Sequence, residues 1–170
     1  MSKFFSLHPT LELDPNPMRW LWLSGLVVLL DQLTKYLASS HLRLYEPVPI
    51  IPSFNLTLMH NTGAAFSLLS EAGGWQRWLF IGLAFLISGL LITWLYKLAR
   101  QKVLLPCALS LVLGGALGNV WDRLSLGYVI DFIDVYYAQW HWPAFNIADS
   151  AISVGAVLLL LDAFREKSKT

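Results

Sequence analysis

The stretch Trp78–Tyr96, WLFIGLAFLISGLLITWLY, contains no Asp, Glu, Lys, Arg or His. A helix needs about 20 consecutive apolar residues to cross the hydrocarbon core of a bilayer. Three further stretches approach this length and composition, at about Trp20–Ala38, Val103–Trp121 and Phe145–Phe164. The sequence therefore predicts an all-α membrane protein, built as a bundle of four transmembrane helices.

The composition of the whole chain agrees with a membrane protein. Of its 170 residues, 56% are hydrophobic and only 14% are charged, and the mean hydropathy is +0.55. A water-soluble domain of this size could not bury so much apolar surface in its core. The net charge of +1 and the lack of a basic run give no indication of nucleic-acid binding. We expect a single integral membrane domain over residues 1–170, acting as a monomer.

The positions of Lys and Arg predict the orientation, because cytoplasmic loops carry the excess of both. Most of them flank the predicted spans on one side, namely Lys3, Arg19, Lys97, Arg100, Lys102, Arg165, Lys167 and Lys169. The first span lacks a small-residue cleavage site, so we interpret it as a retained helix rather than a removed signal peptide. Both termini are therefore expected in the cytoplasm, and the two longer connections outside.

The first outer connection, about Ser39–Gly74, has features of a strand. Three prolines within Pro47–Pro52 break any helix. Apolar and polar residues then alternate over Phe54–Met59, and Asn61–Gly63 is typical of a turn. We expect a small β element here, resting on the outer membrane surface. The second outer connection, about Asp122–Ala144, is rich in aromatic residues and is expected at the membrane interface.

With this orientation, polar side chains from separate segments gather near the outer ends of the helices. They are Asp31 and Lys35 of the first span, Asn119, Asp122 and Arg123 of the third, Asp131 of the second connection, and Asn146 and Asp149 of the fourth span. Charged groups at membrane depth are costly and commonly mark function. The cluster therefore predicts a functional site near the outer face.

Several of these residues also have a simpler structural interpretation. Asp31 and Lys35 stand one helical turn apart, so they can form an ion pair that stabilises helix packing. Asp122 is expected to pair with Arg123 at the helix end, although Arg123 could equally reach a substrate carbonyl or a lipid phosphate. Asn119 could be a plain interhelical hydrogen-bonding residue, as could Asn146 in the fourth span.

Three other residues and one glycine motif are expected to be structural or solvated. Gly114 and Gly118 form a small-xxx-small surface that favours close helix packing. His60 and His141 lack metal-ligand spacing and are expected at the surface or interface. Asp134, near Asp131, is expected to be a solvated loop residue.

Asp131 and Asp149 differ from the other carboxylates, because neither has a cation at helical spacing. On opposite sides of one cavity, they would resist ionising together and would share a proton. A peptide hydrolase requires this state, in which one member takes a proton from water while the other polarises the scissile carbonyl. Charge placement alone leaves two alternatives open, a proton- or ion-coupled carrier and a non-catalytic scaffold.

Five motifs resemble those of the bacterial lipoprotein signal peptidase family, also called signal peptidase II. In chain order they are DQLTK at Asp31–Lys35, HNTGAAF at His60–Phe66, GGALGNVWDR at Gly114–Arg123, VIDF at Val129–Phe132 and FNIADSA at Phe145–Ala151. The resemblance runs from about Trp20 to Arg165. Each motif is weak by itself, but five in this order on four spans are specific.

The resemblance implies an aspartic endopeptidase that removes signal peptides from prolipoproteins, cutting on the amino side of a diacylglyceryl-modified cysteine. It implies that the catalytic dyad is Asp131 and Asp149. Asn61, Asn119, Arg123 and Asn146 would line the pocket, and Asp31 and Lys35 would support the site. It implies no metal or organic cofactor, and membrane lipids as partners. The protein would lie in the bacterial inner membrane, with its active site near the periplasmic face.

Overall fold

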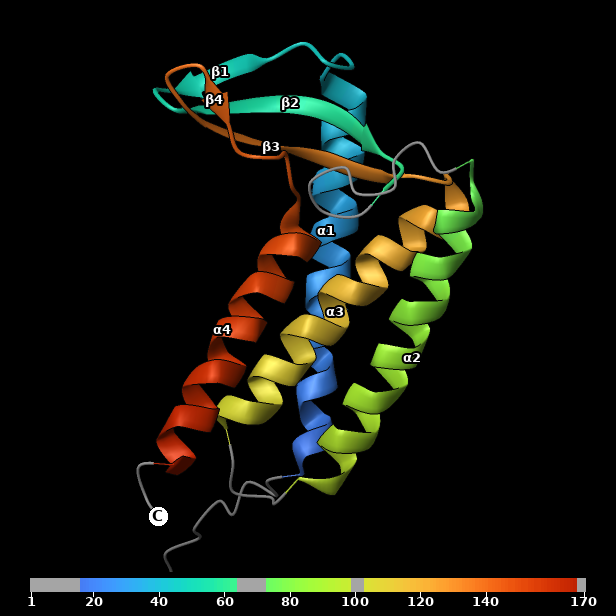
Figure 1. Cartoon of the computed structure of the whole chain (residues 1–170), viewed down its shortest axis with the longest axis vertical. Coiled ribbons are helices and arrows are strands. Elements are labelled where there is room, and N and C mark those ends of the chain that lie inside the picture. Colours follow the sequence, from blue (N-terminus) through green and yellow to red (C-terminus); the bar gives the residue numbers. More distant parts are fainter. Residues whose placement is uncertain (1–15, 64–72, 99–102, 168–170) are drawn as a thin grey trace, which may run out of the picture.

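Four long helices dominate the computed structural model, which describes residues 16–63, 73–98 and 103–167 (Figure 1). They are α1 (Leu21–His41), α2 (Trp75–Lys97), α3 (Leu104–Ser125) and α4 (Ile147–Lys167), and a short 3-10 helix (Pro17–Trp20) precedes α1. Each long helix is apolar and long enough to cross a membrane. The structure thus has a helix at each of the four predicted spans, with ends a few residues from those expected.

The central helix of the bundle is α3, against which α1, α2 and α4 all pack. In the most apolar part of α3, 61% of the residues are buried, against 17–28% in the other three helices. Large apolar side chains on those three, such as Leu29, Leu86 and Phe164, are more than 60% exposed. An apolar surface of this extent fits a lipid environment rather than water.

Small residues on α3 allow its neighbours to approach closely. A Cβ atom added at Gly114 would lie 2.8 Å from the carbonyl oxygen of Ser24 on α1. A Cβ atom at Gly118 would lie 2.7 Å from Oδ2 of Asp31. Both distances are shorter than real Cβ contacts, so the predicted packing role of the two glycines is confirmed. Toward the other end of the bundle, α2 and α3 share a core made of Leu91, Leu95, Leu105, Leu109 and Leu113.

A small antiparallel sheet lies across the end of the bundle where α1 and α3 end and α4 begins (Figure 1). In the described part of the chain its strands follow chain order: β1 (Val48–Ile51), β2 (Phe54–Asn61), β3 (Val129–Tyr137) and β4 (Trp140–His141). The predicted β element in the first connection is thus confirmed for β1 and β2. Residues 64–72, which complete that connection and include the end of the HNTGAAF motif, lie outside the described residues.

The second connection also forms strands that the sequence analysis did not predict, while its position at the membrane interface stays a prediction. The helix α3 continues to Ser125, and the chain then forms β3 and β4. The β-branched and aromatic content of Val129–Tyr137 explains the strand, because such side chains pack well on a half-buried pleated surface. The sheet therefore joins two connections that are distant in sequence.

Pairing between β2 and β3 positions two residues of the candidate site, Asn61 and Asp131. Asn61 lies opposite Val129 and Met59 opposite Asp131, with a register shift between Leu56 and Met59. Beneath the sheet, a small apolar cluster fixes it to the end of α1; its members are Ala38, Leu58, Ile130 and Phe132. The sheet thus has a defined place on the helix ends.

Candidate active site

A pocket of about 1050 Å³ opens between the sheet and the ends of α3 and α4. This volume is at the upper end of the usual range for ligand sites. Its described lining includes five of the predicted site residues: Asn61, Asn119, Arg123, Asp131 and Asp149. The remaining three, Asp31, Lys35 and Asn146, are buried behind that lining.

Asp131 lies on β3 with only 3% of its surface exposed. Its Oδ1 accepts a hydrogen bond from Nδ2 of Asn146 at 2.7 Å, and its Oδ2 accepts one from Nδ2 of Asn61 at 3.0 Å. The backbone N–H of Gly63 donates to Oδ1 of Asn61 at 3.0 Å, which fixes the orientation of that amide and closes the predicted turn. The carboxylate is therefore held at both oxygens.

The electrostatic surroundings of Asp131 favour its protonated form. Burial, followed by the negative charge of Asp149, raises the pKa of Asp131 to about 7. Hydrogen bonds from Asn61 and Asn146 and the charge of Lys35 act in the opposite direction without cancelling this rise. Near neutral pH, Asp131 can therefore either hold or release a proton.

Asp149 is positioned by the start of α4. Oδ1 of Asn146 accepts from the backbone N–H of Asp149 at 2.9 Å, and Oδ2 of Asp149 accepts from the backbone N–H of Asn146 at 3.2 Å. This reciprocal pair has the form of a capping box. Oδ1 of Asp149 accepts from Nδ2 of Asn119 at 2.8 Å. Since Nδ2 of Asn146 also reaches Asp131, the helix cap connects the two aspartates.

Arg123 enters the pocket from the end of α3. Its Nη2 donates to the carbonyl oxygen of Gly63 at 2.8 Å, and its guanidinium carbon lies 5.1 Å from the centre of the Phe80 ring. The expected pairing with Asp122 is wrong, because Oδ2 of Asp122 lies 2.8 Å from Nζ of Lys35 instead. Neighbouring residues on a helix do not face each other, so Asp122 points toward α1 while Arg123 points toward the pocket.

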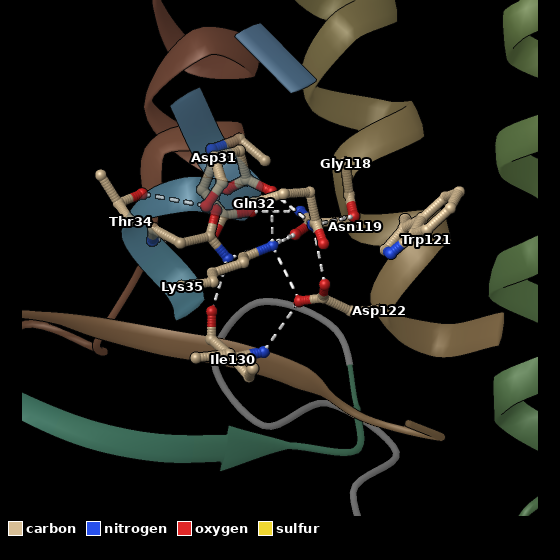
Figure 2. Close-up of polar contacts among 12 residues, drawn as sticks. Asp31, Gln32, Thr34, Lys35, Gly118, Asn119, Trp121, Asp122 and Ile130 are labelled. Atoms are coloured by element: carbon tan, nitrogen blue, oxygen red, sulfur yellow. Dashed lines mark hydrogen bonds and ion pairs between the residues drawn. The ribbon is translucent and has the colours of Figure 1, made fainter. Parts of the chain in front are cut away.

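The predicted ion pair between Asp31 and Lys35 is confirmed, with 2.8 Å between Oδ2 and Nζ (Figure 2). Gln32, which the sequence analysis did not single out, donates from Nε2 to Oδ1 of Asp122 at 2.8 Å. Its polar side chain adjoins the Asp31–Lys35 pair in an apolar helix, a pattern that could have identified it.

We expected Asp134 to be a solvated loop residue, and this prediction is wrong. Asp134 lies on β3 with 2% of its surface exposed. It accepts hydrogen bonds from Asn55 and Thr57 of β2, both at 3.1 Å, and lies 2.7 Å from Nδ1 of His141. Burial acts to raise the pKa of Asp134, but the hydrogen bonds from His141, Asn55 and Thr57 outweigh it and lower that pKa.

The two histidines near the site have separate surroundings. His60 stacks on Tyr128 with 4.0 Å between ring centres, and burial lowers its pKa. The side chain of His141 is 51% exposed, as expected for a surface histidine. Among the described residues, no group of three or more His, Cys, Asp or Glu side chains could hold a metal ion.

The site thus consists of two carboxylates on one pocket, bridged by asparagine amides, at the end of four membrane-length helices. This combination defines the class of membrane-embedded aspartic peptidases. Residues 23–165 match the family model described as signal peptidase (SPase) II. The chain belongs to the signal peptidase II family.

Curated relatives and solved structures agree with this family. The chain is 57% identical over 150 residues to a lipoprotein signal peptidase of Acinetobacter baumannii, with 88% of this chain and 85% of the relative covered. It is 55% identical over 164 residues to that of Acinetobacter baylyi, covering 96% and 92%. A solved bacterial membrane enzyme, determined by the in meso method at 2.3 Å resolution, superposes with a TM-score of 0.81 at 31% identity and covers 90% of this chain and 92% of its own.

Proposed function

We propose that this protein removes signal peptides from prolipoproteins, cutting on the amino side of a diacylglyceryl-modified cysteine, with Asp131 and Asp149 as the catalytic pair. The family and the names of the relatives support the reaction. The observation that carries the residue assignment is that both carboxylates line the same pocket while Asn146 hydrogen-bonds to each of them.

In the proposed reaction, the ionised member of the pair takes a proton from a water molecule as that water attacks the scissile carbonyl. The protonated member donates a hydrogen bond to the carbonyl oxygen, where negative charge develops. The carboxyl group that received the proton from water then gives it to the nitrogen of the leaving cysteine as the C–N bond breaks, so the pair again shares one proton. The pKa of Asp131, raised by burial and by Asp149 to about 7, supports a pair that shares one proton near neutral pH.

The remaining polar side chains of the pocket are assigned to substrate binding and alignment. Arg123 offers guanidinium N–H donors to a peptide carbonyl or a lipid ester. Asn61 and Asn119 hold Asp131 and Asp149, respectively, by single hydrogen bonds. Binding of the non-reacting part of the substrate would then align the scissile bond with the pair.

The shape of the pocket suits a substrate that arrives within the bilayer. Its lining continues along the first turns of α4, through Ser150 and Ser153 to Val154. A signal-peptide helix or the acyl chains of the diacylglyceryl group could enter along this face without leaving the lipid. Membrane lipids would then be the natural surroundings of the enzyme, and nothing in this arrangement requires a second copy of the chain.

We further propose that the sheet end of the bundle faces the periplasm and that both termini are cytoplasmic. The start of α1 and the ends of α2 and α4 lie at the opposite end of the bundle (Figure 1). These helix ends contain or adjoin Arg19, Lys97 and Arg165, so this is the side expected to hold the excess of basic residues. The Pro-rich, alternating segment 39–74 suggests the further hypothesis that it closes over the pocket as a lid; its residues 64–72 lie outside the described residues. Unchanged spin-label distances in its described part on inhibitor binding would count against it.

The decisive experiment compares diacylated and unmodified precursor, side by side, with purified protein in detergent or lipid. Asp131→Asn and Asp149→Asn should each abolish cleavage while retaining cooperative thermal unfolding. Asp162→Asn, in the far half of α4, is the matched control and should cleave normally. Turnover by either dyad variant would refute the assignment. Proton or ion flux across sealed vesicles, without proteolysis, would favour a carrier instead.

A further inference from the structure

A buried ionic cluster lies directly behind the pocket. Nζ of Lys35 lies 2.8 Å from Oδ2 of Asp31, 2.8 Å from Oδ2 of Asp122 and 3.0 Å from Oδ1 of Asn119 (Figure 2). The exposed fractions of Asp31, Lys35 and Asp122 are only 0%, 1% and 1%. These three residues are not among the described residues that line the pocket, whereas Asn119 is. They therefore have no direct route to a substrate.

Each carboxylate of the cluster also holds one backbone N–H group. Oδ1 of Asp31 accepts from the N–H of Ala148 at 2.9 Å, one residue before Asp149. Oδ2 of Asp122 accepts from the N–H of Ile130 at 3.1 Å, one residue before Asp131 (Figure 2). Thus one acid of the cluster holds the segment that carries Asp149, and the other holds the segment that carries Asp131.

Two side chains of α1 join these two acids. Lys35 bridges them through its ammonium group, and Nε2 of Gln32 lies within hydrogen-bonding distance of both, at 3.1 Å from Oδ2 of Asp31 and 2.8 Å from Oδ1 of Asp122. The same nitrogen lies 3.3 Å from the carbonyl oxygen of Gly118. The segments of the two catalytic aspartates are therefore connected through one side of α1.

We propose that Lys35, bridging Asp31 and Asp122, is a positioning residue that sets the distance and orientation between the backbone segments carrying Asp131 and Asp149. This inference rests on the proposed function of the pair. It assigns a role to Asp122 and Gln32 as well, and it separates these residues from the side chains that touch substrate.

Stability alone gives a poor account of this cluster. A buried ion pair loses so much solvation that an apolar replacement of the same volume is often equally stable. The leucine core between α2 and α3 already packs helices in this bundle without any charge. Directional hydrogen bonds and ion pairs hold a fixed geometry better than apolar contacts do. A misplacement of about 1 Å in a catalytic group can reduce the rate by about 100-fold.

The test uses Lys35→Met and Asp122→Asn, with kcat and KM measured separately on the diacylated precursor. We expect kcat to fall by about 100-fold in each variant, because the dyad loses its alignment. KM should stay within about threefold of the original value, because the substrate contacts remain. Arg43→Met is the matched control, since its cation belongs to an exposed pair with Glu46 at 3.7 Å. It should leave both constants unchanged.

The pH profile of kcat/KM provides a readout that simple loss of packing would not move. The charges that act on Asp131 are those of Asp149 on α4, Lys35 on α1 and Arg123 on α3, while Asp122 acts on Arg123 and lies 2.8 Å from Nζ of Lys35. Removing the cation of Lys35 should shift the acidic limb to higher pH. Removing the anion of Asp122 should shift it to lower pH. Loss of packing alone, without a change of charge, predicts neither shift.

The outcomes separate this inference from the proposed function. If Asp131→Asn is inactive while folded Lys35→Met and Asp122→Asn keep kcat within about threefold, the positioning role is refuted and the dyad stands. If Asp131→Asn is active, the dyad itself fails. Should Lys35→Met not fold, Asp122→Asn decides the question, since it keeps the shape of the side chain while it removes the charge and one of the two acceptor oxygens.

Discussion

Asp131 and Asp134 lie three residues apart on the same strand and are both almost fully buried, but their surroundings differ. At Asp131, burial and the nearby carboxylate of Asp149 raise the pKa to about 7. At Asp134, hydrogen bonds from His141 and from two side chains of β2 outweigh burial and lower the pKa. The comparison shows that burial alone does not prepare a carboxyl group for proton transfer. The charged and hydrogen-bonding partners of the carboxyl group determine whether its pKa rises or falls.

The largest expected difference between Asp131 and Asp134 is in their contribution to catalysis. Asp131→Asn should reduce cleavage of the diacylated precursor by at least about 1000-fold, because a group that exchanges protons during the reaction is lost. Asp134→Asn should retain activity within about tenfold, since it removes a structural acceptor. Initial rates of both purified variants on one precursor provide the measurement. Equal losses of activity in the two variants would contradict the catalytic difference between Asp131 and Asp134.

A second variant disturbs the proposed catalytic pair through the segment of Asp149 and leaves Asp134 untouched. A Cβ atom at Gly118 would lie 2.7 Å from Oδ2 of Asp31, and Oδ1 of the same carboxylate accepts from the backbone N–H of Ala148, one residue before Asp149. We expect Gly118→Ala to lower kcat by about tenfold, and stability by about 1–3 kcal/mol through overpacking. Kinetics and thermal unfolding would measure both effects.

The control for this variant is Gly25→Ala on α1, where an added Cβ would meet no atom within 4 Å. It should leave kcat unchanged and stability within about 1 kcal/mol. A similar loss of activity in both variants would show that helix flexibility, and not the contact with Asp31, is responsible.

The pH dependence of stability should have opposite signs for the two aspartates. Between the ordinary pKa of about 3.9 and about 7, folded Asp131 keeps a proton that the unfolded chain has released, so its contribution to stability falls as pH rises. Asp131→Asn removes this loss, and its Tm relative to the original protein should increase from about pH 5 to pH 8. Thermal unfolding in one detergent across this range provides the test.

Asp134 has a lowered pKa, so it stabilises the fold above the ordinary aspartate pKa, and this contribution is lost as pH falls through the folded-state value. The Tm of Asp134→Asn should therefore be lower than that of the original protein at neutral pH, and the deficit should shrink in acid. Parallel pH profiles for the two variants would contradict the assigned surroundings.

The smallest expected effect concerns the partner of Asp134. The side chain of His141 is 51% exposed, although its Nδ1 lies 2.7 Å from Oδ1 of Asp134. Because solvent screens such a pair, His141→Asn should reduce stability by less than about 1 kcal/mol and leave kcat within about twofold. Chemical or thermal unfolding would measure this. A loss of stability as large as that of Asp134→Asn would mean that the imidazole, rather than Asn55 and Thr57, holds the carboxylate.

Features that depend on local sequence were predicted well. The four spans follow from apolar length alone, and the ion pair of Asp31 with Lys35 follows from helical spacing. The position of Asp131 and Asp149 on one pocket was reached through the ordered motifs, since spacing along the chain did not require that they meet.

Features that depend on contacts between distant segments were missed. Asp134 is buried because β2 brings Asn55 and Thr57 to it, and Asp122 faces Lys35 because α1 packs against α3. Neither partner can be read from neighbouring residues. The strand β3 itself could have been recognised from the β-branched and aromatic residues of Val129–Tyr137.

The pairing of β2 with β3 also has a consequence for synthesis of the chain. Asn61 pairs with Val129, and Asp149 lies in the first turn of α4, so the two proposed catalytic carboxylates come together only after the chain has been made as far as α4. A nascent chain that stalls before α4 lacks Asp149 entirely, however well its first three helices have inserted. If the pair is catalytic, proteolysis therefore requires synthesis and insertion of the chain through α4, and a chain truncated before α4 is inactive.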